Sequence, residues 1–114
     1  MTINITHRGL ELTPGITAHI QEKMTSLAKY EDHLEHLDVE VGMTSHHHQK
    51  GDIFFCKVGA LVHGDVIRLE KEEKDLYKAI DKVKDHLRVE LAERKERIRE
   101  RAHGKHSTSL EEAA

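Results

Sequence analysis

The spacing of the hydrophobic residues changes along the chain, and this change constrains the fold more than any other feature. Leu37, Val39, Val41 and Met43 alternate with polar residues or glycine, which is the pattern of a β-strand with one buried face. After residue 75 the spacing becomes three or four residues, the period of a helix with one apolar stripe. This stripe comprises Leu76, Ile80, Val83, Leu87 and Leu91. The pattern predicts a sheet covered by a long helix.

Two further elements are predicted before residue 37. Thr2 to His7 alternates apolar and polar residues, which predicts a first strand. Thr13 followed by Pro14 is a helix start, because threonine caps free amides and proline loses no hydrogen bond at the first helical position. A helix over about residues 14–29 then has one apolar stripe, formed by Ile16, Ile20, Met24 and Leu27.

Two strands are predicted between residue 52 and the long helix. The inward face of the first comprises Phe54, Cys56, Val58, Ala60 and Val62. The residues His63, Gly64 and Asp65 favour a tight turn, and a fourth strand containing Ile67 and Leu69 follows. We therefore expect the last three strands to form an antiparallel meander.

The predicted order is β-α-β-β-β-α, with a last helix that runs from about Asp75, a candidate cap, to beyond Arg99. Because each helix has one apolar stripe to bury, we predict a two-layer α+β domain with a four-stranded sheet and both helices on one face. The domain is expected to span residues 1–102. Residues 103–114 are polar, small and acidic, and we expect them to form a flexible tail.

Composition excludes several classes of protein. The chain has 114 residues and a single cysteine, Cys56, so no internal disulfide can form and no cysteine-based zinc motif is present. The apolar runs are far shorter than the roughly 20 residues of a membrane helix, and the N-terminus has no signal-peptide pattern. We expect a single domain in a reducing, cytoplasmic location, with no membrane partner.

Basic residues are concentrated in one segment of the chain. Residues 1–75 carry 8 basic and 13 acidic side chains, whereas residues 76–105 carry 10 and 6. At 100° per residue, four cations of the long helix fall on one side and form a basic ridge. The ridge comprises Lys84, Arg88, Lys95 and Arg99. A solvated ridge of this kind favours a polyanionic partner that offers phosphate groups.

The charged residues of this helix are also compatible with a second interpretation, in which they only stabilise a solvated surface helix. Mixed charges are common on a surface helix that is held by ion pairs between successive turns. Glu90 with Arg94 and Glu93 with Arg97 have the required spacing. Arg94 also falls where the apolar stripe would continue, which predicts that the helix projects beyond the sheet there.

Motifs for catalysis or metal binding are weak. The triplet His46-His47-His48 consists of adjacent loop residues, which rarely converge on one ion. Cys56 lies on an inward face with no activating base, and His63 with Asp65 lacks a nucleophile. We therefore predict no catalytic residue, no cofactor and no metal site. Phe55 is the one aromatic residue whose register favours exposure on the sheet for base stacking.

Several segments resemble the family of ribosome hibernation promoting factors and the ribosome-associated inhibitor protein Y, formerly called sigma-54 modulation proteins. The most specific match is the stretch from Asp75 to Asp81, Asp-Leu-Tyr-Lys-Ala-Ile-Asp. Supporting matches are Ile3-Asn4-Ile5-Thr6, Leu12-Thr13-Pro14, Val39-Glu40-Val41 and the lysines at 23 and 29. The resemblance covers about residues 1–101 and corresponds to the short form of the family.

The resemblance implies a fold similar to double-stranded RNA-binding domains and a function in translation. It implies a protein that is not an enzyme and does not bind DNA. As a monomer, the protein would bind the decoding channel of the small ribosomal subunit. There the protein would contact 16S rRNA and neighbouring ribosomal proteins and block mRNA and tRNA in stationary phase or stress. Basic positions of the family match Lys23, Lys29, Lys95 and Arg97. Lys84, Arg88 and Arg99 enter the predicted rRNA site from the ridge alone.

The chain also departs from the family pattern. His86 and Val89 stand where relatives commonly have cations, whereas Arg88 supplies a charge one position away. The alternative hypothesis is therefore a regulator that uses the same fold to bind proteins and has weak or no affinity for rRNA.

Overall fold

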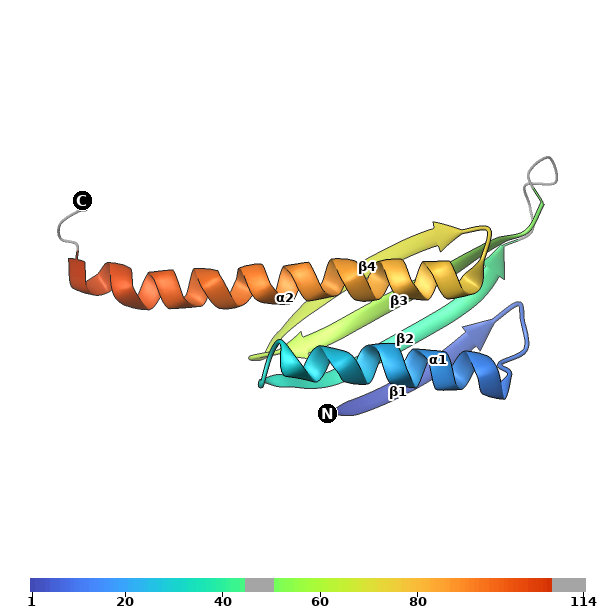
Figure 1. Ribbon diagram of the computed structural model, residues 1–114, viewed down its shortest axis with the longest axis horizontal. Helices are drawn as coiled ribbons and strands as arrows, with labels where there is room; N and C mark the ends of the chain where they lie inside the picture. The colour runs from blue at the N-terminus through green and yellow to red at the C-terminus, as the bar shows by residue number, and fades with distance from the viewer. Residues whose placement is uncertain (45–50, 108–114) are drawn as a thin grey trace.

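The computed structural model describes the backbone of residues 1–44 and 51–107 and the side chains of residues 1–44 and 51–100. It contains one mixed sheet and two long helices (Figure 1), in the predicted order β-α-β-β-β-α. In chain order the elements are β1 (Thr2–Arg8), α1 (Pro14–Thr25), the 3-10 helix η1 (Ser26–Lys29), β2 (Leu34–Thr44), β3 (Ile53–Val62), β4 (Asp65–Glu73) and α2 (Leu76–Ser107).

The four strands lie side by side in the order in which they occur in the chain. β1 pairs with β2 in parallel, and the other neighbours are antiparallel, as predicted for the last three strands. Parallel neighbours need a crossover connection, and α1 provides it. β3 and β4 are joined through His63 and Gly64, whose φ angles are 53° and 82°. Positive φ at both central residues is what a type I′ hairpin turn requires.

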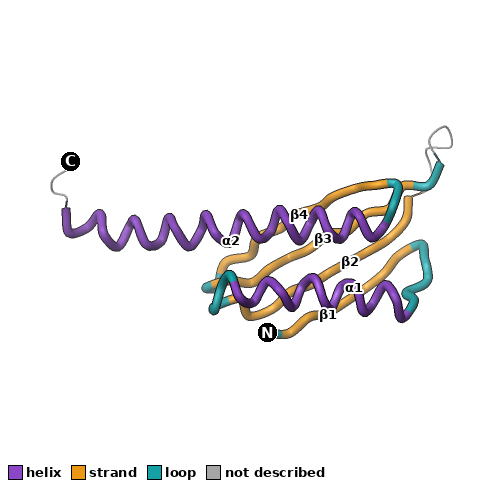
Figure 2. Tube along the Cα trace, in the orientation of Figure 1, coloured by secondary structure: helices purple, strands orange, loops and turns teal. Residues whose placement is uncertain are grey.

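Both helices cover the same face of the sheet (Figure 2), which confirms the predicted two-layer architecture. The whole predicted stripe of α2 is buried there, with Ile80, Val83, Leu87 and Leu91 inaccessible to solvent. These side chains share one core with the inward face of the sheet and with Ile20 and Met24 of α1. Burial of apolar area against the sheet is what holds α2 in a single rotation about its axis.

The predicted helix starts are confirmed. The Thr13 hydroxyl accepts a hydrogen bond from the Ile16 amide at 3.2 Å, and the Asp75 carboxylate accepts one from the Tyr77 amide at 2.9 Å. The predicted first helix, in contrast, changes form near its end. α1 stops at Thr25 and continues as η1, whose tighter turn places Leu27 in the core with no exposed surface.

The prediction of an exposed Phe55 is wrong. Its side chain lies on the face of the sheet away from the helices, yet only 4% of it is exposed. The ring covers Gly42 of the neighbouring strand, where an added Cβ would lie 2.4 Å from it. Arg8 and Lys57 cover the ring, at 5.7 and 5.5 Å from its centroid. Phe55 is thus a packing residue that is not available for stacking a base.

The long helix continues beyond the boundary that the sequence predicts for the domain. α2 runs to Ser107, so the division between residues 102 and 103 falls inside it and stays a prediction. The triplet at residues 46–48 and the last part of the tail, residues 108–114, lie outside the described residues. Within the described part of the chain, no helix is both long enough and apolar enough to cross a membrane.

The buried stripe of α2 leads to a first prediction. Leu87→Asp places a charge in the contact between helix and sheet, and we expect it to lower the free energy of unfolding by about 4 kcal/mol. The matched control is Val89→Asp, two residues away, where 41% of the side chain is exposed. Urea unfolding followed by circular dichroism should show a cooperative transition near the wild-type midpoint only for the control. Equal midpoints for the two variants would contradict the assigned rotation of α2.

The single thiol yields a second prediction. Burial raises the pKa of the Cys56 thiol to about 12, and the side chain has no exposed surface. Because the thiolate is the reactive form, we expect a thiol-reactive disulfide reagent at neutral pH to modify the folded protein at least about a hundredfold more slowly than the urea-unfolded chain. A rate in the folded protein close to the unfolded rate would show that β3 is not covered by the helices.

Candidate nucleic-acid interface

A polar contact joins the two helices where they lie side by side. The ring nitrogen Nε2 of His19, on α1, lies 2.8 Å from the Asp81 carboxylate on α2. The edge of the same imidazole packs against Tyr77, with ring centroids 4.8 Å apart. α1 and α2 consequently run beside each other over the sheet (Figure 1), and one flank of α2 faces α1. Side chains of both helices contribute to the surface along this line of contact, which we call the groove.

Tyr30 brings two of the predicted cations together at the end of the groove. The Lys29 ammonium and the Arg88 guanidinium lie 5.9 and 5.8 Å from the centroid of its ring. Both distances are in the range of cation–π attraction. Lys29 came from the family resemblance and Arg88 from the helical ridge, so the ring connects two predictions that were independent. The sequence analysis did not assign a role to Tyr30, because its contact with Arg88 spans 58 positions and leaves no local pattern.

The remaining ridge residues share the groove side of α2 with Arg88. They follow at helical spacings of four and seven residues, which keeps them on one side. The Lys84 ammonium is partly covered and lies 3.5 Å from the neighbouring carboxylate of Asp85. Lys95 is exposed and close enough to Glu31 to help lower the pKa of that carboxyl. Arg99 lies 3.5 Å from Glu96. The ridge thus begins over the sheet and continues where α2 projects beyond it.

The two cations predicted on the first helical segment lie along the same groove. Lys23 is half-buried and follows His19 by one helical turn, so both are on the side of α1 that faces α2. Lys29 closes η1 beside Tyr30. The structure therefore places six predicted residues on one continuous side of the helices: those at positions 23, 29, 84 and 88 lie where α1 and α2 meet, and those at 95 and 99 continue along α2 beyond it.

Arg97 is the exception among the predicted residues. It lies two positions from both Lys95 and Arg99, and residues two apart on a helix do not face the same way. Its side chain is exposed on the opposite side of α2, away from the groove. Its assignment to the site rests on the family resemblance alone.

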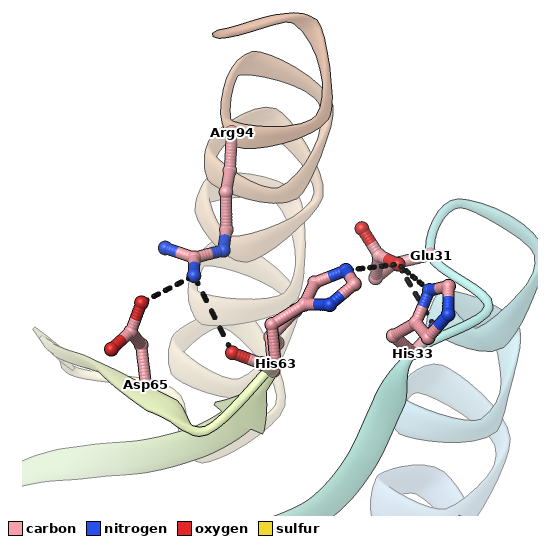
Figure 3. A network of polar contacts seen from close by, with 6 residues as sticks. Glu31, His33, His63, Asp65 and Arg94 are labelled. Carbon is pink, nitrogen blue, oxygen red and sulfur yellow. Dashed lines mark hydrogen bonds and ion pairs between the residues drawn. The ribbon is translucent and has the colours of Figure 1, made fainter. Parts of the chain in front are cut away.

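The glutamate–arginine pairs that we expected for a surface helix held only by ion pairs do not form in the described part of the chain. Glu90 lies 3.6 Å from the ring of His86 instead of reaching Arg94. Arg94 points toward the turn between β3 and β4 (Figure 3), where it donates hydrogen bonds to the Asp65 carboxylate at 2.5 Å and to the Val62 carbonyl at 3.5 Å. This contact anchors α2 at the point where it leaves the sheet, beyond its last buried leucine.

Four cations of the groove remain available to a partner. Among residues 1–44 and 51–100, no acidic side chain forms an ion pair with these four. They are Lys23, Lys29, Arg88 and Lys95. Lysine and arginine in this state bind phosphate oxygens and release the counterions of a nucleic acid, without selecting particular bases. The groove can therefore bind a phosphate backbone through its charges.

The opposite face of the sheet has a different electrostatic character. A shallow hollow of about 540 Å³ lies there over the strands, and its charged lining comprises three carboxylates, Asp38, Glu40 and Glu70, and two cations, Lys57 and Arg68. Arg8 pairs with Glu40 at 2.8 Å. The hydrogen bond from His36 lowers the pKa of Asp38, and Asn4 donates a second hydrogen bond to the same carboxylate. A hollow whose carboxylates outnumber its cations does not favour a polyanion, so the surface between the helices is the candidate interface.

Comparison with known proteins identifies related chains. The model of a family described as Sigma 54 modulation protein / S30EA ribosomal protein matches residues 3–99. A ribosome hibernation promotion factor of Bacillus subtilis (strain 168) is 26% identical over 98 residues, which are 86% of this chain. The match covers 50% of that relative, so the chain spans about half the length of the curated protein that it resembles.

Two solved structures have the same fold. The Protein Y N-terminal domain of Thermus thermophilus superposes with a TM-score of 0.65 at 28% identity, covering 82% of this chain and 98% of that domain. A ribosomal subunit interface protein from Coxiella burnetii superposes with a TM-score of 0.69, covering 83% of this chain and 98% of its own. At 18% identity this second likeness supports the fold alone.

The cluster around Tyr30 leads to a third prediction. Tyr30→Leu keeps an apolar side chain but removes the aromatic ring, and Arg88→Gln removes the cation. A double-mutant cycle on urea unfolding should give a coupling energy of about 0.5–1 kcal/mol between the two sites. The control cycle pairs Arg88→Gln with Tyr77→Leu, since Tyr77 contacts His19, and should give no coupling. Equal coupling in the two cycles would contradict a specific contact between Arg88 and Tyr30.

Proposed function

The chain belongs to the Sigma 54 modulation protein / S30EA ribosomal protein family, and from this membership we propose that it is a ribosome-associated hibernation factor. It binds the small subunit in the decoding channel through 16S rRNA and neighbouring ribosomal proteins. By occupying this channel it blocks mRNA and tRNA in stationary phase or stress. The mechanism is steric, and it needs neither a catalytic residue nor a cofactor.

The observation that carries this proposal is the groove in which cations of both helices meet. Lys29 and Arg88 both contact one tyrosine ring, although 59 positions separate them in the chain. Lys23 and Lys95 extend the same surface in both directions. Folded RNA presents phosphates from several strands at once, and a groove of fixed cations suits such a surface better than a single flexible basic segment.

The chain differs from the family pattern at two positions of α2, and these differences affect how strongly it binds rRNA. His86 and Val89 stand where relatives have cations, but His86 pairs with Glu90 on the side of α2 away from the groove. Val89 is exposed and uncharged. Arg88, between them, reaches Tyr30 in the groove. We therefore propose that Arg88 replaces the missing family charges and that the groove binds phosphates with fewer cations than its relatives use.

Competition binding tests the mechanism directly. Purified small subunits are loaded with a labelled leaderless mRNA and initiator tRNA, and the protein is added at increasing concentration. Steric occlusion predicts that the protein displaces both labels and that excess mRNA and tRNA displace the protein in turn. Stable binding to the subunit with no loss of either label would place the protein outside the decoding channel. No binding would favour the alternative of a protein-binding regulator on the same fold.

The groove cations lead to a fourth prediction, tested with two variants of equal charge. Arg88→Glu with Lys95→Glu reverses two groove cations, whereas Lys74→Glu with Lys78→Glu reverses two exposed lysines, one just before α2 and one in its first turn. We expect the first variant to weaken small-subunit binding at least about a hundredfold, because each phosphate contact becomes a repulsion. The second should stay within a few-fold of the wild type.

Sedimentation with small subunits measures both variants, and circular dichroism confirms that each is folded. Equal loss in the two variants would show that net charge, and not the groove, determines binding. Unchanged binding in both would remove the groove from the proposed function.

A further inference from the structure

A cluster of three side chains lies outside the groove, at the end of the sheet from which α2 projects (Figure 3). Glu31 and His33 come from the connection between η1 and β2, and His63 comes from the turn between β3 and β4. One carboxylate oxygen of Glu31 is 3.3 Å from Nδ1 of His33 and 3.7 Å from Nε2 of His63. One ligand atom from each residue lies within 4.8 Å of the other two.

Glu31 is an unusual member of this cluster because it is a buried acid. Only 3% of it is exposed, and it is the one charged residue in the buried part of the described chain. Burial by itself raises the pKa of Glu31, but hydrogen bonds from the backbone amide and ring of His33, together with the nearby His63 and Lys95, lower it overall. A buried, ionised carboxylate is normally paired or coordinates a metal ion. Here the groups that face it are imidazoles, which are themselves metal ligands.

His63 occupies a backbone conformation that few residues other than glycine adopt. Its φ angle is 53°, and it is the only residue other than glycine with a positive φ in the described part of the chain. Asparagine, aspartate or glycine is the ordinary choice at the first central position of such a turn. Backbone strain that persists in a fold is a reason to look for a function of the side chain. The imidazole that this position carries is aimed at Glu31.

The geometry is close to that of a metal site. Zinc binds imidazole nitrogen and carboxylate oxygen at about 2.0–2.2 Å with tetrahedral angles, so neighbouring ligand atoms lie about 3.3–3.6 Å apart. The separations of Glu31 from His33 and His63 are near this range. The two imidazole rings approach the same carboxylate oxygen, with ring centroids 4.2 Å apart and planes inclined by 32°. The two imidazole nitrogens lie within 4.8 Å of each other, so side-chain rotations that bring them closer would let all three ligand atoms reach one ion.

We propose that Glu31, His33 and His63 bind one divalent transition-metal ion, for which zinc is the best match. Each neutral imidazole carries its proton on the nitrogen that faces away from the ion, so two nitrogens and one oxygen coordinate it and a fourth position stays open to water. This donor set favours zinc, nickel, copper or cobalt over magnesium and calcium, which prefer oxygen ligands. The site does not depend on ribosome binding.

Metal binding at this place would connect segments that are distant in the chain. The ion would tie the connection after η1 to the turn between β3 and β4, the same turn that Arg94 of α2 contacts through Asp65. A ligand that binds only the folded protein raises its melting temperature. Zinc is therefore expected to stabilise the base of the projecting helix.

The experiment uses the full chain without an affinity tag, stripped of metal by a chelator. Titration calorimetry with zinc chloride should show one ion per chain with a dissociation constant in the micromolar range or below, and a melting temperature several degrees higher. Magnesium at the same concentration should produce neither effect. His33→Gln should weaken zinc binding at least about tenfold. His63→Asn should do the same while keeping a residue that suits the positive φ.

A matched control separates this cluster from the other histidines. His46, His47 and His48, which lie outside the described residues, are replaced together by glutamine, and this variant should bind zinc as the wild type does. Loss of binding in the triplet variant with retention in His33→Gln and His63→Asn would overturn the assignment. So would the absence of stoichiometric zinc binding to the wild-type protein. If either single variant fails to fold, as judged by circular dichroism, the zinc affinity of the other variant decides whether the assignment holds.

Discussion

Burial of one apolar stripe on α2 is the contact on which the rest of the molecule depends. Ile80, Val83, Leu87 and Leu91 are all inaccessible to solvent, and together they fix the rotation of a helix that is longer than the sheet it covers (Figure 1). Once that rotation is fixed, the flank that carries Lys84, Arg88 and Lys95 must face α1. The same packing that stabilises the fold therefore orients the cations, and a slip of the helix about its axis would disperse them.

The sequence predicted the architecture well because the fold is encoded in short-range patterns. Alternation and helical spacing, together with the caps at Thr13 and Asp75, were enough for the element order and for both helix starts. The errors came from contacts across the sheet or along the helix surface. Phe55 is buried because Gly42 on the next strand leaves room for its ring, and no pattern within β3 signals that vacancy. Arg94 contacts Asp65 instead of a glutamate one turn away.

The candidate site was predictable only in part, for a related reason. Helical periodicity identified the ridge on α2, and the family resemblance supplied Lys23 and Lys29, but neither shows that these two sets meet. Tyr30 joins them through a tertiary contact with Arg88. The cluster of Glu31 with His63 is likewise formed by a loop and a turn that are 32 positions apart. Chemistry that arises between distant segments leaves no signature in either segment alone.

The central claim is that cations fixed between two helices bind the phosphate backbone of the small ribosomal subunit. Its most direct test is the affinity of the protein for separated small and large subunits, measured across a series of salt concentrations. The account predicts preferential binding to the small subunit, with the logarithm of affinity falling linearly with the logarithm of salt by a slope of about 3 or more, since four cations of the groove are unpaired. Binding that does not change with salt, or that is equal for the two subunits, would contradict it.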